Sequence, residues 1–220
     1  MGITSRKVRS LKRTPEVPRV RDARLVVIAA EDTYAAKQYF ESDLFHSSRI
    51  QIEVLETPNS DEAENKKTAS SPGEVETRLR GYIAKYDLND EDILCIMVDR
   101  DRWPDSTLAD ISQKTFRKKR KNILMAVSNP CFEVWLFLHV SDWNKSISHI
   151  TSKKMTLLLR QTLGEYNKNS LNIEKYRGRI LLACDRAKNM DSSSTDRWPQ
   201  TIGTYVYRLI EELKAFCDLH

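Results

Sequence analysis

Apolar runs of strand length alternate with segments of helical periodicity along the first 130 residues. The apolar runs are RLVVIAA at 24–30, IQIEVLE at 50–56, DILCIMVD at 92–99 and NILMAVS at 122–128. The segments with helical spacing between them are 31–45, 73–86 and 107–121. Continuous apolar strands that alternate with helices indicate an α/β fold with a mainly parallel sheet covered on both faces. The second run alternates and has one wetter face, so we expect it at an edge.

The pattern changes after about residue 130, where strand signals stop and four helical segments follow. They cover 130–140, 153–163, 173–190 and 201–217. The first opens on Pro130, which suits an N-terminal helical turn. Residues 57–73 are polar and rich in Pro, Gly and Ser, and predict a long loop. We therefore expect a basic leader at 1–23, an α/β core at 24–145, and a helical extension at 146–220 packed on that core.

Charge and composition narrow the class of protein. The net charge of the 220 residues is +5, and the basic residues gather in the leader and in RKKRK at 117–121. Both patches could contact phosphate, but a solvated tail and a solvated helix end would have the same basic composition. No apolar stretch reaches the 18 residues of a membrane span, and no secretory signal is present. Four widely spaced cysteines predict reduced core thiols, so we expect a cytoplasmic protein without membrane contact.

Acidic residues stand at the ends of two of the apolar runs. Glu31 follows the first, and Asp99 and Asp101 follow the third. The carboxyl ends of parallel strands form the ligand crevice of α/β sheets, and residues two apart in extended backbone point the same way. Converging carboxylates suit Mg²⁺ or Mn²⁺. Turn formation and helix capping explain these positions equally well. An ATPase strand of the Walker B type is excluded, because the chain has no GxxxxGK[ST] loop.

Further candidates are weaker. Glu133 follows SNP at 128–130, where a glutamate is also favoured by the dipole of the helix that begins there. His139 lies among aromatic and aliphatic residues and is expected to be a packing residue. Tyr166 and Lys168 lie in a turn between helices, where a lysine is usually solvated. No Ser, Cys or His has a triad-like setting.

Together these motifs resemble a known family. An acid after a first strand and a DxD after a later one resemble the TOPRIM domain of topoisomerases, primases and OLD-family nucleases. More specifically, the chain is similar to the RloB family found beside phage-defence ATPases. The similarity covers most of the chain, and its motifs are SLKR, VVIAAEDTYAAKQYF, VDRD, SNPCFEVWLFLH, YNK and PQTIGTYVYRLIEEL. The family usually has E-G and then a T-E pair, whereas this chain has Asp32 in place of the glycine and Ala35 and Ala36 in place of the pair.

The resemblance implies a TOPRIM-like fold and a metal-dependent nuclease that acts as the toxic effector of an antiphage system with an ABC- or SMC-like ATPase partner. Glu31, Asp99 and Asp101 would hold Mg²⁺ or Mn²⁺, and Glu133 would be a further ligand or a base. Phosphate would be bound by Arg100, Arg102 and Lys168. The nucleic acid could be RNA, with tRNA suggested by analogy, or DNA, and the amphipathic C-terminal helices could support a homodimer.

Two other hypotheses use the same residues. A non-catalytic subunit of the same fold could dock on the ATPase or on nucleic acid, which the altered Glu-Gly and Thr-Glu positions favour. A receiver-like phosphoacceptor domain also has aspartates at strand ends. The long helical C-terminal third and the missing order of acids, Thr or Ser and Lys disfavour the receiver-like domain.

Overall fold

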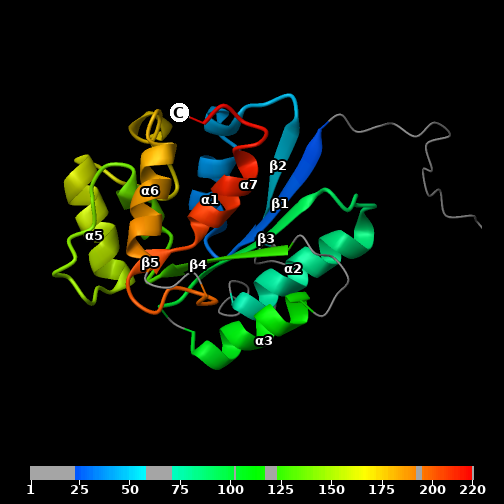
Figure 1. The fold of residues 1–220 in the computed structure, drawn as a ribbon, viewed down its shortest axis with the longest axis horizontal. Coiled ribbons are helices and arrows are strands. Elements are labelled where there is room, and N and C mark those ends of the chain that lie inside the picture. Colours follow the sequence, from blue (N-terminus) through cyan, green and yellow to red (C-terminus); the bar gives the residue numbers. More distant parts are fainter. Residues whose placement is uncertain (1–22, 58–70, 102, 117–122, 192–194, 220) are drawn as a thin grey trace, which may run out of the picture.

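Five strands form one sheet at the centre of the described part of the protein (Figure 1). The computed structural model describes residues 23–57, 71–101, 103–116, 123–191 and 195–219. The strands are β1 (Arg24–Ala30), β2 (Ile50–Leu55), β3 (Ile93–Asp99), β4 (Ile123–Asn129) and β5 (Gly203–Thr204). Their order is β2-β1-β3-β4-β5, with β1 to β4 parallel and β5 antiparallel to β4. The predicted mainly parallel sheet is confirmed, and β2 lies at an edge as expected.

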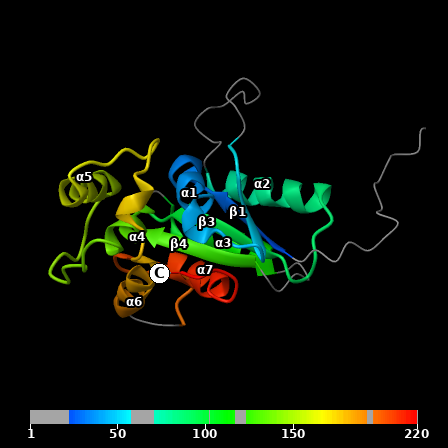
Figure 2. The same cartoon turned by 90° about the horizontal axis from the view of Figure 1, so that it is seen from above.

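The two faces of the sheet follow from the alternation of side chains along each strand. On β1, Val26 and Ile28 belong to one hydrophobic cluster, whereas Val27 and Ala29 belong to the other. Helices cover both faces, so the strands are apolar on both sides and read as continuous apolar runs (Figure 2). The larger cluster extends from Val26 to Leu219 and so includes residues of the C-terminal helices.

The helices between the strands agree with the expected periodicity. They are α1 (Thr33–Phe40), α2 (Pro72–Lys85) and α3 (Asp105–Phe116). Side-chain caps begin two of them: the Asp32 carboxylate accepts the Ala35 N–H, and the Ser71 hydroxyl accepts the Glu74 N–H. Helices α2 and α3 contribute to the smaller cluster, and α1 to the larger one.

The C-terminal part is helical, with three departures from the expected segments. Its helices are α4 (Glu133–Leu138), α5 (Ser152–Leu163), α6 (Ile180–Met190) and α7 (Val206–Leu213), with a 3₁₀ turn at Ile173–Lys175. Pro130 lies before α4 and not in its first turn, and its carbonyl accepts the Asp101 N–H at the sheet edge. The segment 173–190 is interrupted at Gly178, whose φ is +71°.

The third departure is a strand that the pattern did not indicate. Gly203 and Thr204 pair with the end of β4, so helix α7 begins only at Val206. The hydroxyls of Ser128 and Thr204 are 2.8 Å apart across this pair. A strand of two residues is too short to produce an alternating pattern, which explains why the sequence predicted helix there.

Several expected features lie outside the described residues. They are the basic leader up to residue 22, Arg102, the RKKRK segment at 117–121 and most of the 57–73 loop. All four cysteines are buried and unpaired, as expected, and burial raises the pKa of Cys95 to about 12. None of the helices in the described ranges has the length and apolar character needed to cross a lipid bilayer.

Candidate functional site

Glu31 and Asp99 meet where β1 and β3 end. The Glu31 N–H donates to the Met97 carbonyl at 2.9 Å, which extends the ladder by one residue beyond β1. The Asp99 N–H donates to Glu31 Oε2 at 3.2 Å. Trp103 Nε1 donates to the same carboxylate, at 3.1 Å from Oε1 and 3.2 Å from Oε2. The predicted proximity of these two acids, at the carboxyl edge of the sheet, is therefore observed.

The turn after β3 is tied to the end of β4. The Arg100 N–H donates to the Ser128 carbonyl at 2.8 Å, and the Asp101 N–H donates to the Pro130 carbonyl at 3.2 Å. Asp101 is exposed, and its Oδ2 accepts the Ser152 hydroxyl at 2.5 Å from the start of α5. The C-terminal helical part thus supplies a contact to the DxD motif.

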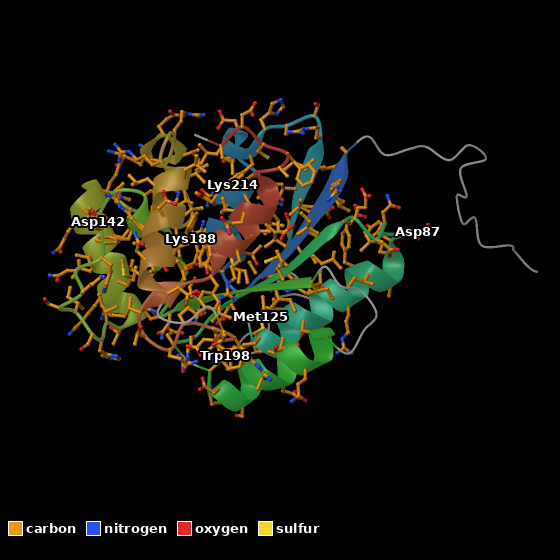
Figure 3. All side chains as sticks on the ribbon, in the orientation of Figure 1. Asp87, Met125, Asp142, Lys188, Trp198 and Lys214 are labelled. Carbon is orange, nitrogen blue, oxygen red and sulfur yellow. The ribbon has the colours of Figure 1, made fainter. Side chains whose placement is uncertain are left out.

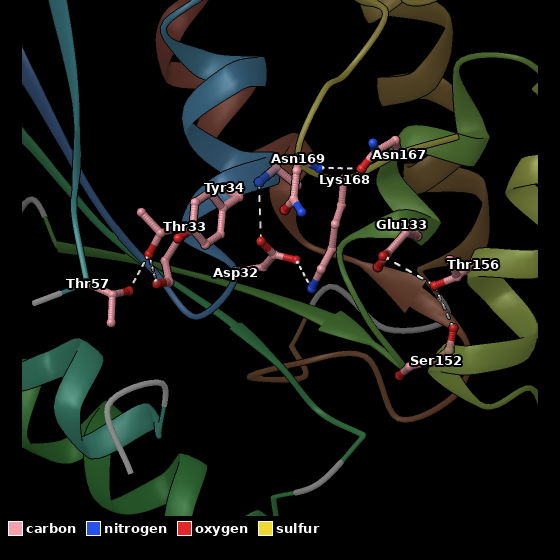
Figure 4. Close-up of polar contacts among 12 residues, drawn as sticks. Asp32, Thr33, Tyr34, Thr57, Glu133, Ser152, Thr156, Asn167, Lys168 and Asn169 are labelled. Atoms are coloured by element: carbon pink, nitrogen blue, oxygen red, sulfur yellow. Dashed lines mark hydrogen bonds and ion pairs between the residues drawn. The ribbon is translucent and has the colours of Figure 1, made fainter. Parts of the chain in front are cut away.

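Glu133 enters the same region from the first turn of α4 and is only 8% exposed. Its Oε1 lies 3.3 Å from the Tyr166 hydroxyl. The same oxygen lies 3.3 Å from the Thr156 hydroxyl (Figure 4). Burial raises the pKa of Tyr166 first, and the Glu133 and Asp32 carboxylates raise it further. The Tyr166 hydroxyl therefore stays protonated and can donate to Glu133 at any physiological pH.

Asp32 and Lys168 form an ion pair near these acids. The region at the carboxyl edge that holds Glu31, Asp99, Asp101 and Glu133 is called the acidic crevice below. Lys168 Nζ lies 3.2 Å from Asp32 Oδ2 (Figure 4). Burial lowers the pKa of Lys168, but the carboxylates of Asp32, Glu133 and Asp99 outweigh it and raise that pKa overall. Ala36, which stands where the family pattern has its second acid, is 1% exposed in the core.

Several carboxylates surround Asp99 and disfavour negative charge on its side chain. Burial raises the pKa of Asp99 well above its ordinary value, and the nearby carboxylates of Glu31, Glu133, Asp101 and Asp32 raise it further. The same acids act on Cys131, whose pKa is raised by burial and then by Glu133 and Asp99. Like charges held this close favour either a shared proton or a bound cation.

The donor types fit a hard metal ion, but the described side chains do not form a ready cluster. Carboxylate oxygens from Glu31, Asp99, Asp101 and Glu133 are the ligands that Mg²⁺ and Mn²⁺ prefer. Within the described ranges, no group of three or more His, Cys, Asp or Glu side chains is placed so that it could hold a metal ion. Glu31 faces the Trp103 indole and Asp101 faces Ser152, so these carboxylates are directed to separate partners.

Arg100 is directed away from the acids. Its guanidinium donates to the Pro199 carbonyl at 2.5 Å, to Asp105 Oδ1 at 2.8 Å and to Gln200 Oε1 at 3.2 Å. This arrangement suits a residue that fixes the turn after β3 better than the expected phosphate contact. Of the three cations expected to bind phosphate, Lys168 lies at the crevice and Arg102 falls outside the described residues.

His139 has the packing role expected from its apolar surroundings. It is fully buried, its Nδ1 lies 3.0 Å from the Trp135 carbonyl, and its Nε2 lies 2.9 Å from the Tyr39 hydroxyl. Burial lowers the pKa of His139 to about 3, so the imidazole is neutral. It serves as a donor to the carbonyl and an acceptor from the tyrosine.

Sequence reasoning missed Thr156, which contacts Glu133, and three further residues of this region. They are Trp103, Ser152 and Asp32. Trp103 follows the DxD by two positions, and the DRDRWP stretch offered the only local signal for it. Ser152 is 51 residues away from Asp101, and only the packing of α5 beside the sheet edge brings them together. Asp32 was noticed as a departure from a family pattern, without its contact to Lys168.

Comparison with known proteins gives one clear result. A family model described as RloB-like protein matches residues 26–213. Neither the search of curated proteins nor the search of solved structures found a match. The matched range contains every described acid of the crevice, together with Trp103 and Lys168. Because the match extends over most of the chain, this protein belongs to the RloB-like family.

Proposed function

We propose that the protein is a metal-dependent nuclease that cleaves phosphodiester bonds at the crevice where β1 and β3 end. The observation that carries the proposal is the gathering of Glu31, Asp99, Asp101 and Glu133 around one carboxyl edge, which raises the pKa of Asp99 through burial and mutual repulsion. Such a charge concentration is costly for the fold, and perturbed acids of this kind cluster at functional sites.

Different residues would bind the metal ion, bind the phosphate and accept a proton. Glu31, Asp99 and Asp101 would hold Mg²⁺ or Mn²⁺, which lowers the pKa of bound water and offsets charge on the phosphate oxygens. Lys168 would contact a phosphate oxygen, since its ammonium is held in place by Asp32. Glu133, oriented by Tyr166, is the candidate to accept a proton from the attacking water.

Nuclease assays of the purified protein test the proposal. Single-stranded and duplex RNA and DNA, including tRNA, are incubated with Mg²⁺ or Mn²⁺, with and without the candidate ATPase partner. We expect Asp99→Asn to reduce cleavage at least 100-fold. Asp87→Asn is the matched control, because Asp87 is exposed beyond the end of α2, at the opposite edge of the sheet (Figure 3). Full cleavage by Asp99→Asn would contradict the assignment of the site.

A second candidate function has one observation in its favour. The lack of a ready metal-ligand group among the described residues fits a non-catalytic subunit that binds a partner ATPase or nucleic acid. Thermal melting in Mn²⁺ and Mg²⁺ discriminates the two. Stabilisation by metal that Glu31→Gln or Asp99→Asn removes would favour the nuclease. Unchanged melting, with nucleic-acid binding intact in both variants, would favour the binding subunit.

We extend the proposal to the biological setting that the family resemblance implies. The nuclease would be a toxic effector of antiphage defence, restrained or activated by an ABC- or SMC-like ATPase. Co-expression tests this: toxicity of the protein alone should require Asp99 and change when the ATPase is present. Toxicity that persists in Asp99→Asn would argue against it.

A further inference from the structure

A pocket of ≈ 450 Å³ lies directly behind Tyr166, between the end of α5 and the 3₁₀ turn at Ile173–Lys175. Tyr166 connects it to the acidic crevice, because this residue lines the pocket while its hydroxyl lies 3.3 Å from Glu133. The volume falls in the range of small-molecule sites. Any ligand in this pocket would lie beside the proposed cleavage site.

The loop that forms one wall is held in place before any ligand binds. Gln38 of α1 clamps it, donating to the Lys168 carbonyl at 2.8 Å and accepting the Leu171 N–H at 2.7 Å. Within the loop, Asn167 Oδ1 accepts the Asn169 N–H at 3.0 Å. A wall fixed by hydrogen bonds reduces the entropy lost on binding.

Tyr176 contributes a further polar group to the lining of the pocket. Tyr176 lines the pocket, is 1% exposed, and makes no hydrogen bond through its hydroxyl in the part of the chain that the structure describes. Its ring is fixed by edge contacts with Tyr39 and His139, at centroid distances of 5.9 and 5.2 Å. The side chain is therefore held in one orientation, with its hydroxyl free to bond a ligand in the pocket.

Two side-chain amides add donors and acceptors. Asn172 is exposed, lines the pocket and makes no side-chain hydrogen bond within the described ranges. Asn167 uses its oxygen within the loop, which leaves its Nδ2 without a partner there. Leu171 supplies apolar surface and Lys175 a positive charge on the same lining. Glu165 adds one carboxylate to the lining. The amides and phenols suit the edge of a base, the apolar wall suits its face, and Lys175 is the group that would meet a phosphate.

We propose that this pocket binds one unpaired nucleotide next to the scissile phosphodiester, and that Asn167 and Asn172 read its base. The position of the nucleotide next to a cleaved bond rests on the proposed nuclease function. Binding of a nucleotide by the pocket stands independently of cleavage. Lys168 and Tyr166 then separate the base-reading pocket from the acids that act on the phosphate.

Nucleotide binding is tested first, without cleavage. The full-length protein is titrated with AMP, GMP, CMP, UMP, their deoxy counterparts and inorganic phosphate while backbone amide NMR signals are followed. We expect one base to move the signals of 163–176, and Asn172→Ala and Asn167→Asp to weaken its binding about 5- to 30-fold. Asn167→Asp keeps the oxygen that the loop needs. Gln161→Ala, exposed on α5 outside the pocket, is the matched control and should bind as the wild type does.

Cleavage then tests the position of the pocket. On oligonucleotides randomised at single positions, Asn172→Ala should flatten the base preference at one position and raise KM, with kcat within about twofold of wild type. Nucleotide binding by the pocket would be contradicted if no nucleotide shifted the amide signals of residues 163–176, or if nucleotides bound no more tightly than inorganic phosphate. If the wild-type protein binds a nucleotide there but cleaves no nucleic acid, the proposed nuclease activity is contradicted, whereas nucleotide binding by the pocket is supported. If the Asn172→Ala variant cleaves nucleic acid with the base preference of the wild type, Asn172 does not recognise the base.

Discussion

The backbone N–H of Asp99 donates to the carboxylate of Glu31 at 3.2 Å, across 68 positions of sequence. Asp99 ends β3 and Glu31 follows the neighbouring parallel strand β1, whose ladder the Glu31 N–H extends through the Met97 carbonyl. The hydrogen bond between Asp99 and Glu31 brings an acid of one strand end against the main chain of the other. The charge that accumulates there is the basis of most of the expectations below.

Asp99→Asn should make the metal-free protein more stable at neutral pH. Because the pKa of Asp99 is raised in the folded protein, its favourable contribution is present at low pH and is lost as pH rises through that pKa. The neutral amide removes the repulsion. Melting in EDTA should show a higher Tm for the variant, by about 2–4 °C per kcal/mol recovered.

The stability difference between wild type and Asp99→Asn should shrink as pH falls towards the ordinary value of 3.8, and it levels off below that pH, where the wild-type carboxyl is protonated in both the folded and the unfolded state. Asp87→Asn should melt as the wild type does, since Asp87 is exposed. A lower Tm for Asp99→Asn in EDTA at pH 7 would contradict the repulsion.

Trp103→Phe should impair activity while the fold persists. The change removes the N–H that holds the Glu31 carboxylate but keeps an aromatic ring. Residues that orient metal ligands affect affinity or activity about 10- to 100-fold, so we expect a fall of that size in kcat/KM and a higher Mg²⁺ requirement. Trp143→Phe, which removes an indole bond to the Ile147 carbonyl, should change neither. Equal losses in both variants would indicate a general packing effect.

Lys168→Ala should raise KM about 10-fold or more, because a charged contact to phosphate is lost. A double-mutant cycle with Asp32→Ala separates this role from a purely structural one. If Lys168 served only to pair with Asp32, Lys168→Ala would have no further effect in the Asp32→Ala background. We expect the KM effect to persist there. Lys145→Ala is the control, since Lys145 is exposed in the loop before α5.

His139 should make the fold sensitive to acid. Its pKa is about 3 in the folded protein, against 6.5 as the ordinary value, so the unfolded chain binds one more proton between these pH values. The free energy of unfolding should fall by about 1.4 kcal/mol per pH unit from this residue as pH decreases below 6.5. Above 6.5 the residue adds no pH dependence.

Urea unfolding from pH 7 to 5 measures this dependence. His139→Gln should be less stable at pH 7, because buried hydrogen bonds to Tyr39 and Trp135 are disturbed, but its slope against pH should be smaller by up to one proton. His46→Gln, at an exposed position, should keep the wild-type slope. Identical slopes for wild type and His139→Gln would contradict the buried neutral imidazole.

Much of the fold was determined by local sequence pattern. Apolar runs at β1, β3 and β4 predict buried parallel strands, because a sheet covered on both faces needs apolar residues at every position. The topology of such a sheet then places Glu31 and Asp99 at one edge. The proximity of these two acids could therefore be predicted from the sequence, although 68 residues separate them.

Only the tertiary structure decided which other groups contact the acids. Ser152 reaches Asp101, and Tyr166 reaches Glu133, because α5 and the loop after it pack against the sheet edge. Arg100 donates to the Pro199 carbonyl, 99 positions away, and this contact also depends on how distant segments pack. Periodicity reports which face of an element is buried, but not which distant segment covers it. Those partners depend on long-range packing, which no local pattern encodes.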